Sequence, residues 1–349
     1  MSNFDYTTVD QQIQKLKAQR LSFGNENFAR SVLKTFGYYN IINGYRDPYI
    51  TRDHNGKTYV PGVTFEQIFD LFSLDHSIRN SVLVSMIDME EHLKAVAANI
   101  IAEAFGCDYA DYLAPSRYRN RATSDPRFGR DSILNTMEQV ARTTHIQPIQ
   151  YYRENHPVIP PWILFKGLQF GTFVNYLKLF KGPQKTALVQ ELYSHRLSTV
   201  DMDILKDLLS DTLFLLLEYR NLAAHGGRIY NYIPRSTVRY FTVDGREASR
   251  GLPLLLSALS LFEYSQPFER LHNSISASLS RYCSLHPNDV SRLEIATGFD
   301  IELEDRVWIN PRTKKFHLSQ YCSGSKNNAE ISLKQAKQEG FVPCKRCFK

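Results

Sequence analysis

The longest regular pattern of apolar and polar residues lies in the stretch Asp203–Asn231, DILKDLLSDTLFLLLEYRNLAAHGGRIYN. Its apolar side chains recur every three or four residues, which predicts a long helix with one buried face. The apolar positions are Ile204, Leu205, Leu208, Leu209, Leu213, Leu216 and Leu217. Gly226 and Gly227 follow this pattern, and glycine readily adopts the left-handed conformation that ends a helix. We therefore expect the helix to stop at these two glycines.

The predicted helix carries three polar side chains to its C-terminal end. Asn221 and His225 lie four residues apart on one face, and Arg220 lies beside them. An always-charged guanidinium that binds phosphate, next to an imidazole that titrates near neutral pH, is what phosphodiester chemistry requires. The alternative is a plain helix end with a hydrogen-bonded histidine, and the pattern alone leaves both open.

Apolar periodicity predicts helices through most of the remaining chain. They are expected as two helices within 6–36, a pair at 65–72 and 78–105, a proline-started helix near Pro160, and helices between Leu252 and Cys283. The core candidates of the first two are Leu16, Leu21, Phe23, Phe28, Val32, Leu33 and Phe36.

Glu90 and Lys94 have the spacing of a modest surface ion pair. A second interpretation is that Glu90 holds Arg220.

Residues 107–147 are rich in arginine, and Pro115, Pro126 and Gly129 predict a loop in their first half. The arginines are Arg117, Arg119, Arg121, Arg127, Arg130 and Arg142. Such a loop would either contact RNA phosphates or simply be solvated, and the sequence favours neither.

The composition is that of a soluble globular protein, with 43% apolar and 22% charged residues among 349. No apolar run approaches the roughly 20 residues that span a bilayer. The N-terminus lacks the apolar segment of a signal peptide. We therefore expect a cytoplasmic protein without membrane contact.

The net charge of +6 is concentrated near the C-terminus. From Arg306 onward ten Lys/Arg face only Glu330 and Glu339, a net charge of +8, which leaves −2 for the rest of the chain. Basic tails commonly contact nucleic acid, although a solvated basic surface is the competing interpretation.

Three of the five cysteines lie in this basic tail, in the pattern His317-x4-Cys322, a spacer of 21 residues, and Cys344-x2-Cys347. Two close pairs of such ligands are typical of a structural zinc site. A strand pair at 307–310 and 314–317 and a helix opened by Ser332 predict a ββα unit around it. A unit of this size has too little core to fold unaided, so zinc would supply stability.

Several stretches resemble one protein family. RNLAAH has the form of the Arg-x4–6-His motif of HEPN ribonucleases, and RNLAAHGGRIYN resembles the pattern of the Abi-like (AbiD/AbiF) abortive-infection proteins. YYNIINGY at 38–45, PPWILF at 160–165, FGTF at 170–173 and ATGF at 296–299 are also similar to that family, in the same order. Lys166 departs from it, because the family usually has an acidic residue there. The resemblance covers about residues 6–300.

The resemblance implies a mainly α fold, with a HEPN-type helical domain at 1–300 and the zinc-binding module at 301–349. The tail itself is similar to the zinc module of Ada-type DNA-repair proteins. In those proteins a cysteine thiolate at the first ligand position accepts a methyl group, and His317 cannot do this. A structural or nucleic-acid-binding role remains for the module.

The family resemblance also implies a function, which is metal-independent cleavage of RNA in bacterial antiphage or toxin-like defence. The 2′-hydroxyl would attack the adjacent phosphorus, with His225 as general acid or base, Arg220 stabilising charge and Asn221 orienting one of them. Arg228 and Asn231 would either bind flanking phosphate or brace the loop.

The expected partners follow from the same resemblance. HEPN nucleases usually pair two motifs across a dimer, and RNLAAHGGRIYN occurs once, so a homodimer is implied. A small non-coding RNA or an antitoxin is a further expected partner. Two other functions stay open: a non-catalytic RNA-binding protein that holds a small structured RNA as a ribonucleoprotein, and a DNA-contacting regulator built on the zinc module.

Overall fold

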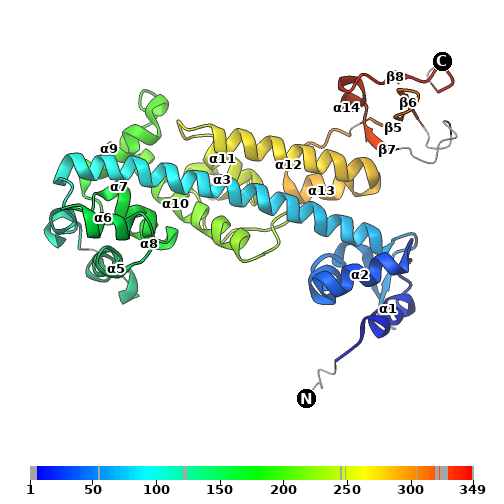
Figure 1. Ribbon diagram of the computed structural model, residues 1–349, viewed down its shortest axis with the longest axis horizontal. Helices are drawn as coiled ribbons and strands as arrows, with labels where there is room; N and C mark the ends of the chain where they lie inside the picture. Colours follow the sequence, from blue (N-terminus) through cyan, green and yellow to red (C-terminus); the bar gives the residue numbers. More distant parts are fainter. Residues whose placement is uncertain are drawn as a thin grey trace. The chain divides into compact units, whose positions relative to one another are not determined.

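The computed structural model describes residues 6–53, 56–120, 123, 125–243, 246–247, 249–303, 305–318, 322 and 329–347 (Figure 1). The chain divides into two compact units. Met1–Ser77 and Ile275–Lys349 form the first unit, and Ile78–Ser274 form the second. The helices α3 (Phe65–Phe105) and α12 (Gln266–Leu285) begin in one unit and end in the other.

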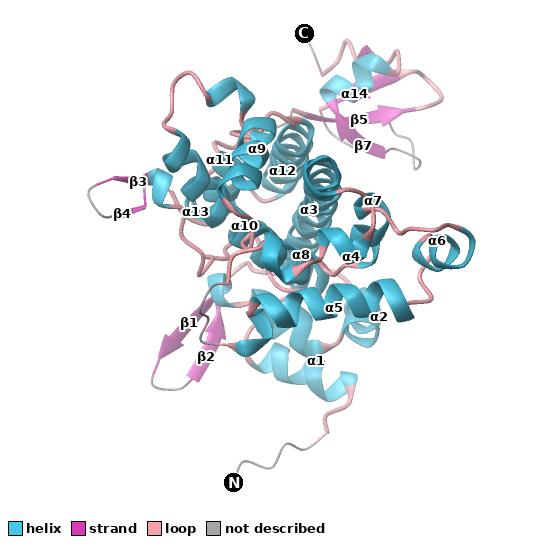
Figure 2. Cartoon of the chain, turned by 90° about the vertical axis from the view of Figure 1, so that its left-hand side faces the viewer, coloured by secondary structure: helices cyan, strands magenta, loops and turns pink. Residues whose placement is uncertain are grey.

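The fold is mainly helical, with strands confined to short pairs and a small C-terminal sheet (Figure 2). This confirms the predicted fold class. Within the described residues, no helix combines the length and the hydrophobicity that a membrane span requires. The predicted domain boundary at residue 300 stays a prediction.

The first unit opens with the two predicted helices, α1 (Val9–Ala18) and α2 (Glu26–Phe36). Thr8 and Gln11 form a capping box at the start of α1, which satisfies backbone N–H groups that the helix leaves unpaired. Of the predicted core residues, Leu16, Leu21, Val32 and Leu33 are buried. Phe28 and Phe36 are 38% and 40% exposed and lie against Phe69, so their assignment to the core was wrong.

The predicted pair of helices at 65–72 and 78–105 is one continuous helix, α3. The expected break lies at residues 73–77, but the polar side chains of Ser73 and Asp75 have hydrogen-bond partners in the structure. The Ser73 hydroxyl donates to the Phe69 carbonyl at 2.9 Å, and the fully buried Asp75 accepts a hydrogen bond from the Tyr45 hydroxyl at 2.6 Å. A partner 30 residues away therefore allows a carboxylate in the middle of the helix.

Tyr45 ends an aromatic segment that contains a single π-helical turn, η1 (Tyr39–Asn43). Ile41 and Ile42 are buried there, whereas Tyr39 is 75% exposed. The segment continues through η2 (Asp47–Tyr49) into an antiparallel strand pair, β1 (Ile50–Asp53) and β2 (Gly56–Tyr59).

The first unit also contains the end of α12, η8 (Pro287–Asp289) and α13 (Val290–Thr297). A buried polar cluster joins these elements to η2. Asp289 accepts hydrogen bonds from the hydroxyls of Tyr49 and Tyr282 at 2.8 and 2.6 Å, and it pairs with Arg292 at 2.8 Å. We call these four residues the Asp289 cluster.

The C-terminal part of the first unit is a four-stranded sheet in the order β7 (Ala329–Ser332), β5 (Arg306–Asn310), β6 (Lys315–His317), β8 (Val342–Pro343). Helix α14 (Leu333–Gln338) begins at Ser332, whose hydroxyl accepts the Gln335 N–H at 3.1 Å. The predicted strand pair and helix are therefore present, and β7 and β8 are additional strands. The sheet has its own core of Val307, Ile309, Phe316, Ala336 and Phe341.

The second unit consists of short helices around α10 (Met202–Ala224). The other helices are α4 (Tyr109–Tyr112), η3 (Pro115–Arg117), η4 (Pro126–Phe128), α5 (Arg130–Thr143), α6 (Ile149–Asn155), α7 (Pro161–Leu164), η5 (Phe165–Gly167), α8 (Phe170–Leu177), α9 (Gly182–Leu192), η6 (Ser194–Arg196), η7 (Arg239–Phe241) and α11 (Leu252–Leu259). The strands are β3 (Thr242–Val243) and β4 (Arg246–Glu247).

Helix α10 contacts α8, α9 and α11, as its long apolar face predicts. Gly171 on α8 lies beside Leu217 of α10, where a Cβ atom would make an ordinary van der Waals contact at 3.8 Å. Most of the predicted apolar face is buried, but Ile204 is 50% exposed near the start of the helix. The apolar face is therefore buried from Leu205 to Leu216.

Candidate active site and metal centre

Helix α10 ends at the two glycines, as predicted. The Gly227 N–H donates to the Leu222 carbonyl at 2.9 Å and the Gly226 N–H to the Ala223 carbonyl at 3.3 Å, with φ of +73° at Gly226. These are the two hydrogen bonds of a Schellman motif. A side chain at Gly227 would lie 2.2 Å from the Leu222 side chain. The Arg79 guanidinium on α3 donates to the Gly226 carbonyl at 3.1 Å, so this turn is fixed from two sides.

The structure places the predicted catalytic residues on the last turns of α10. His225 is the C-cap residue, and its side chain and that of Asn221 are exposed. Arg220 is 32% exposed, and its Nη1 lies 3.5 Å from the Asn221 Oδ1.

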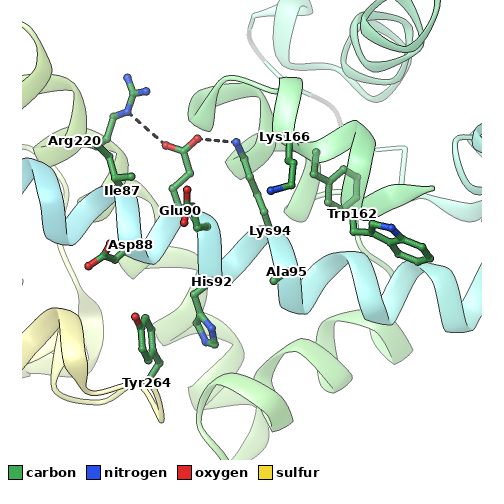
Figure 3. Close-up of a pocket in the computed structure, with 12 residues that line it drawn as sticks. Ile87, Asp88, Glu90, His92, Lys94, Ala95, Trp162, Lys166, Arg220 and Tyr264 are labelled. Carbon is green, nitrogen blue, oxygen red and sulfur yellow. Dashed lines mark hydrogen bonds and ion pairs between the residues drawn. The ribbon is translucent and has the colours of Figure 1, made fainter. Parts of the chain in front are cut away.

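Arg220 is held by a carboxylate on α3 (Figure 3). Its Nε lies 3.6 Å from the Glu90 Oε2, which is an ion pair too long for a hydrogen bond. The Lys94 ammonium donates to the Glu90 Oε1 and to the Leu168 carbonyl, both at 2.7 Å. We call Glu90, Lys94 and Arg220 the Glu90 cluster.

The expectation of a surface pair between Glu90 and Lys94 was wrong, because their side chains are only 12% and 13% exposed. Two cations share one carboxylate, so the cluster keeps a net positive charge. Charges interact more strongly in this partly buried setting than in bulk water. Arg220 is therefore oriented by Glu90 without being neutralised, which suits binding of an anion.

A cavity of about 810 Å³ lies beside Arg220. Its walls come from α3, from the segment containing α7 and η5, and from the residues before α12 (Figure 3). The lining residues are Ile87, Asp88, Glu90, Glu91, His92, Lys94, Ala95, Trp162, Phe165, Lys166, Arg220 and Tyr264. Lys166, the departure from the family pattern, is among them.

The segment after His225 returns along α10. Ile229 and Tyr230 are buried, and the Arg228 guanidinium lies 6.0 Å from the centre of the Tyr230 ring. Asn231 is exposed. The two residues expected to bind flanking phosphate thus lie on a segment that packs against the protein, and their role stays a prediction.

Glu218 on α10 fixes the next residues of this segment. Its carboxylate accepts hydrogen bonds from the Tyr232 hydroxyl and from the N–H groups of Arg235 and Ser236, the latter two at 2.8 and 2.9 Å. Burial acts to raise the pKa of Glu218, but these hydrogen bonds outweigh it and lower the pKa. The carboxylate stays charged at neutral pH and keeps the segment near the helix end.

The arginines of residues 107–147 are largely engaged locally. Arg127 pairs with Asp125, Arg130 with Asp131 and Arg142 with Glu138, at 2.6–2.8 Å, while the Arg117 guanidinium lies 5.0 Å from the centre of the Phe105 ring. Arg121 lies outside the described residues. These pairs reduce the charge that the loop offers to a phosphate backbone.

The Arg-x4-His spacing also occurs at Arg312–His317, where His317 is one of the predicted metal ligands, and at Arg281–His286. Arg281 and His286 lie in the first unit at the end of α12. The His286 Nε2 lies 2.8 Å from the Asp70 Oδ2, and the ring packs on Tyr282 at 4.8 Å. Neither an asparagine nor a pair of glycines accompanies this spacing, so the longer pattern is what distinguishes Arg220–His225.

The predicted metal ligands come together in the C-terminal sheet. The ligand atoms of His317, Cys322, Cys344 and Cys347 all lie within 4.8 Å of one another. The Cys347 sulfur lies 3.2 Å from that of Cys322 and 3.9 Å from the His317 Nδ1. His317 is 4% exposed, and its Nε2 has no hydrogen-bond partner among the described residues. Four soft ligands at these separations fit one tetrahedral metal ion.

The two remaining cysteines, Cys107 and Cys283, do not belong to this ligand cluster. Cys283 is fully buried, and burial raises the pKa of its thiol to about 11, whereas Cys107 is half-buried.

Fold and site together define a mainly helical protein with a polar helix end and a separate Cys/His cluster that can hold a metal ion. The model of the Abi-like protein family matches residues 31–231, more than half of the chain, and the chain belongs to this family. The family associates the chain with abortive-infection defence. No curated protein and no solved structure matches the chain.

Proposed function

We propose that the chain is a metal-independent endoribonuclease of abortive-infection defence, with Arg220, Asn221 and His225 in its active site. The observation that supports this most is the ion pair that orients Arg220 at the open end of α10, where His225 is exposed. The family match covers both residues. Arg228 and Asn231 would contact the flanking phosphates.

The proposed mechanism moves two protons. The 2′-hydroxyl gives its proton to a neutral imidazole as its oxygen bonds to phosphorus, and a protonated imidazole gives a proton to the departing 5′-oxygen. His225 supplies these groups. The Arg220 guanidinium stabilises the charge that develops on the phosphorane oxygens, and Asn221 orients Arg220 through the contact between their side chains.

A homodimer would supply both imidazoles. If the two α10 ends face one another across a two-fold axis, one His225 acts as base and the other as acid. Light scattering should show a dimer at the concentrations where RNA is cut. An active monomer would rule out this arrangement.

We further propose that the metal is zinc and that its role is structural. His317, Cys322, Cys344 and Cys347 would fill all four positions and leave none open for substrate. Purified protein should contain about one zinc per chain, and Cys347→Ser should lose zinc and unfold the C-terminal sheet. The sheet has a core of its own, so the helical part should remain folded.

The net charge of +8 from Arg306 onward favours a second candidate, a non-catalytic protein that holds a small structured RNA as a ribonucleoprotein. Such an RNA, or an antitoxin, would also be the expected partner that restrains a nuclease. Copurification of one discrete, uncut RNA with a protein that cuts no RNA would favour this candidate.

The deciding experiment exposes RNA and DNA of matched sequence to the protein in excess chelator, with its zinc content measured before and after. Only RNA should be cut, leaving a 2′,3′-cyclic phosphate and a 5′-hydroxyl, because the nucleophile is the 2′-hydroxyl. His225→Ala should lower the rate by a factor on the order of 10² to 10⁴. Arg220→Lys should also impair cleavage, since an ammonium lacks the two-pronged contact.

His145→Ala is the matched control, because His145 is an exposed histidine outside the cavity lining. It should cut RNA at the wild-type rate. A folded His225→Ala protein with full activity, or products that end in a 5′-phosphate, would contradict the proposal.

A further inference from the structure

The cavity beside Arg220 forms a groove along the exposed side of α3. Ile87, Glu91 and Ala95 lie four residues apart on that side, and Ile87 is 42% exposed. Figure 3 shows Arg220 and Lys166 on one side of α3, and His92 with Tyr264 on the other. The groove thus extends from the proposed catalytic arginine over several residues of helix.

An exposed tryptophan stands at this groove. Trp162 is 43% exposed although its neighbours on α7, Ile163 and Leu164, are buried. An indole ring offers a large apolar face together with a polar N–H group, and here part of it is open at the groove. Two further rings line the groove, His92 and Tyr264, whose centres lie 4.8 Å apart.

Several charged side chains line the groove, and not all of the cations among them are neutralised by a carboxylate. The carboxylate of Asp88 pairs with Arg270 at 2.5 Å, and that of Glu90 is shared by Lys94 and Arg220. Lys166 is exposed and has no ion-pair partner among the described residues. Glu91 is the exposed carboxylate that opposes it.

We propose that this groove is a nucleotide subsite, in which Trp162 stacks on an unpaired base of RNA and Lys166 contacts the neighbouring phosphate. The proposal rests on the proposed function, because Arg220 would bind the phosphate that is cut and the subsite would hold a nucleotide next to it. A base can stack on an aromatic side chain only when it is free of its own helix, so the substrate class is single-stranded or looped RNA.

Binding is measured separately from cleavage, with the full-length His225→Ala protein and a labelled ten-nucleotide single-stranded RNA of mixed sequence. Trp162→Ala should raise Kd by roughly 5- to 150-fold, the range found for loss of one stacked base. Trp162→Phe should restore part of the affinity. Lys166→Ala should weaken binding. It should also reduce the slope of log affinity against log salt concentration by about the contribution of one phosphate contact.

Tyr151→Ala is the matched control, since Tyr151 is 52% exposed on α6 and does not line the groove. It should leave Kd unchanged. Glu91→Gln should tighten binding by removing the opposing charge. The same RNA annealed to its complement should bind the Trp162→Ala and parent proteins equally, because its bases are already stacked.

The two proposals fail in different ways. If Trp162→Ala leaves the Kd for single strands unchanged while His225→Ala abolishes cleavage, the subsite is wrong and the nuclease stands. If Trp162-dependent binding is found in a wild-type protein that cuts no RNA, the subsite stands and the nuclease fails. If Trp162→Ala instead disrupts a dimer and leaves RNA affinity unchanged, the groove is an interface between copies and the subsite is refuted.

Discussion

Two partly buried carboxylates in this protein have opposite surroundings. Asp289, in the first unit, is 5% exposed and accepts from Tyr49 and Tyr282 while it pairs with Arg292. Glu90, in the second unit, binds two cations, and its contact with Arg220 is 3.6 Å long. Short hydrogen bonds surround the first carboxylate, whereas the second leaves a cation facing a cavity.

The difference separates a stabilising cluster from one that prepares a side chain for binding. The Asp289 cluster joins η2, α12 and η8. Exclusion of water strengthens its hydrogen bonds and thereby stabilises the contact between these elements. The Glu90 cluster keeps a net positive charge beside a groove of about 810 Å³. Substitutions in the first should act on stability, and those in the second on activity.

The largest expected effect is that of Asp289→Ala. Removing one partner of a buried ion pair leaves Arg292 without its carboxylate and takes the acceptor from two tyrosine hydroxyls. This should cost about 3 to 5 kcal/mol of folding free energy. Denaturant unfolding measures this loss. A destabilisation below about 1 kcal/mol would show that the cluster is not the stabilising one.

The next effect is that of Glu90→Gln on RNA cleavage. The glutamine keeps the size of the side chain but removes the charge that orients Arg220, and misplacing a catalytic group commonly costs a factor on the order of 10². The rate under saturating RNA should fall while the folding free energy changes little, and Glu90→Asp should recover part of the rate. Equal losses of activity in Asp289→Ala and Glu90→Gln at matched folded fractions would remove the distinction between the clusters.

A smaller effect is expected on the folding stability at low pH. Burial acts to raise the pKa of Asp289, but hydrogen bonds from Tyr282, Arg292 and Tyr49 outweigh it, so the pKa lies below its usual value. A carboxyl group whose pKa is lower in the folded state than in the unfolded state stabilises the fold at pH values above its unfolded-state pKa, about 3.9. This stability is lost as the pH falls through the folded-state pKa. Between pH 5 and pH 2 the wild-type protein should therefore lose stability more steeply than Asp289→Asn, as thermal unfolding at each pH would show.

The smallest expected effect is that of Tyr49→Phe. It removes a hydroxyl that donates to Asp289 and also contacts the Tyr282 hydroxyl and the Arg292 guanidinium, both at 2.9 Å. The ion pair between Asp289 and Arg292 stays, and Tyr282 still donates to Asp289 at 2.6 Å. A hydrogen bond to a charged group is worth about 1.5 to 3 kcal/mol. The loss on denaturant unfolding should thus stay below that of Asp289→Ala, and RNA cleavage should be unaffected.

Local signals were enough to predict the end of α10 and the metal ligands. The glycine pair and the ligand spacings act over a few residues or within one small unit, so the sequence displays them directly. The helix stop at Gly226 and the grouping of His317 with three cysteines both appear in the structure.

Features that depend on distant partners could not be predicted. The Asp75 carboxylate inside α3 is satisfied by Tyr45, and the Lys94 ammonium by Leu168, 74 residues further along the chain. Without these partners the sequence suggested a helix break and a surface ion pair. The strands β7 and β8 are four and two residues long, too short for an alternating pattern to stand out.

Helix α3 also sets how this protein can change over evolutionary time. Arg79 and Glu90 both contact the last turns of α10, and one uninterrupted helix carries them. Each residue of an α-helix turns the chain by about 100° and advances it by about 1.5 Å. Inserting or deleting a single residue between them would rotate Glu90 away from Arg220. This interval should therefore accept exchanges of its outward-facing residues while its length stays invariant.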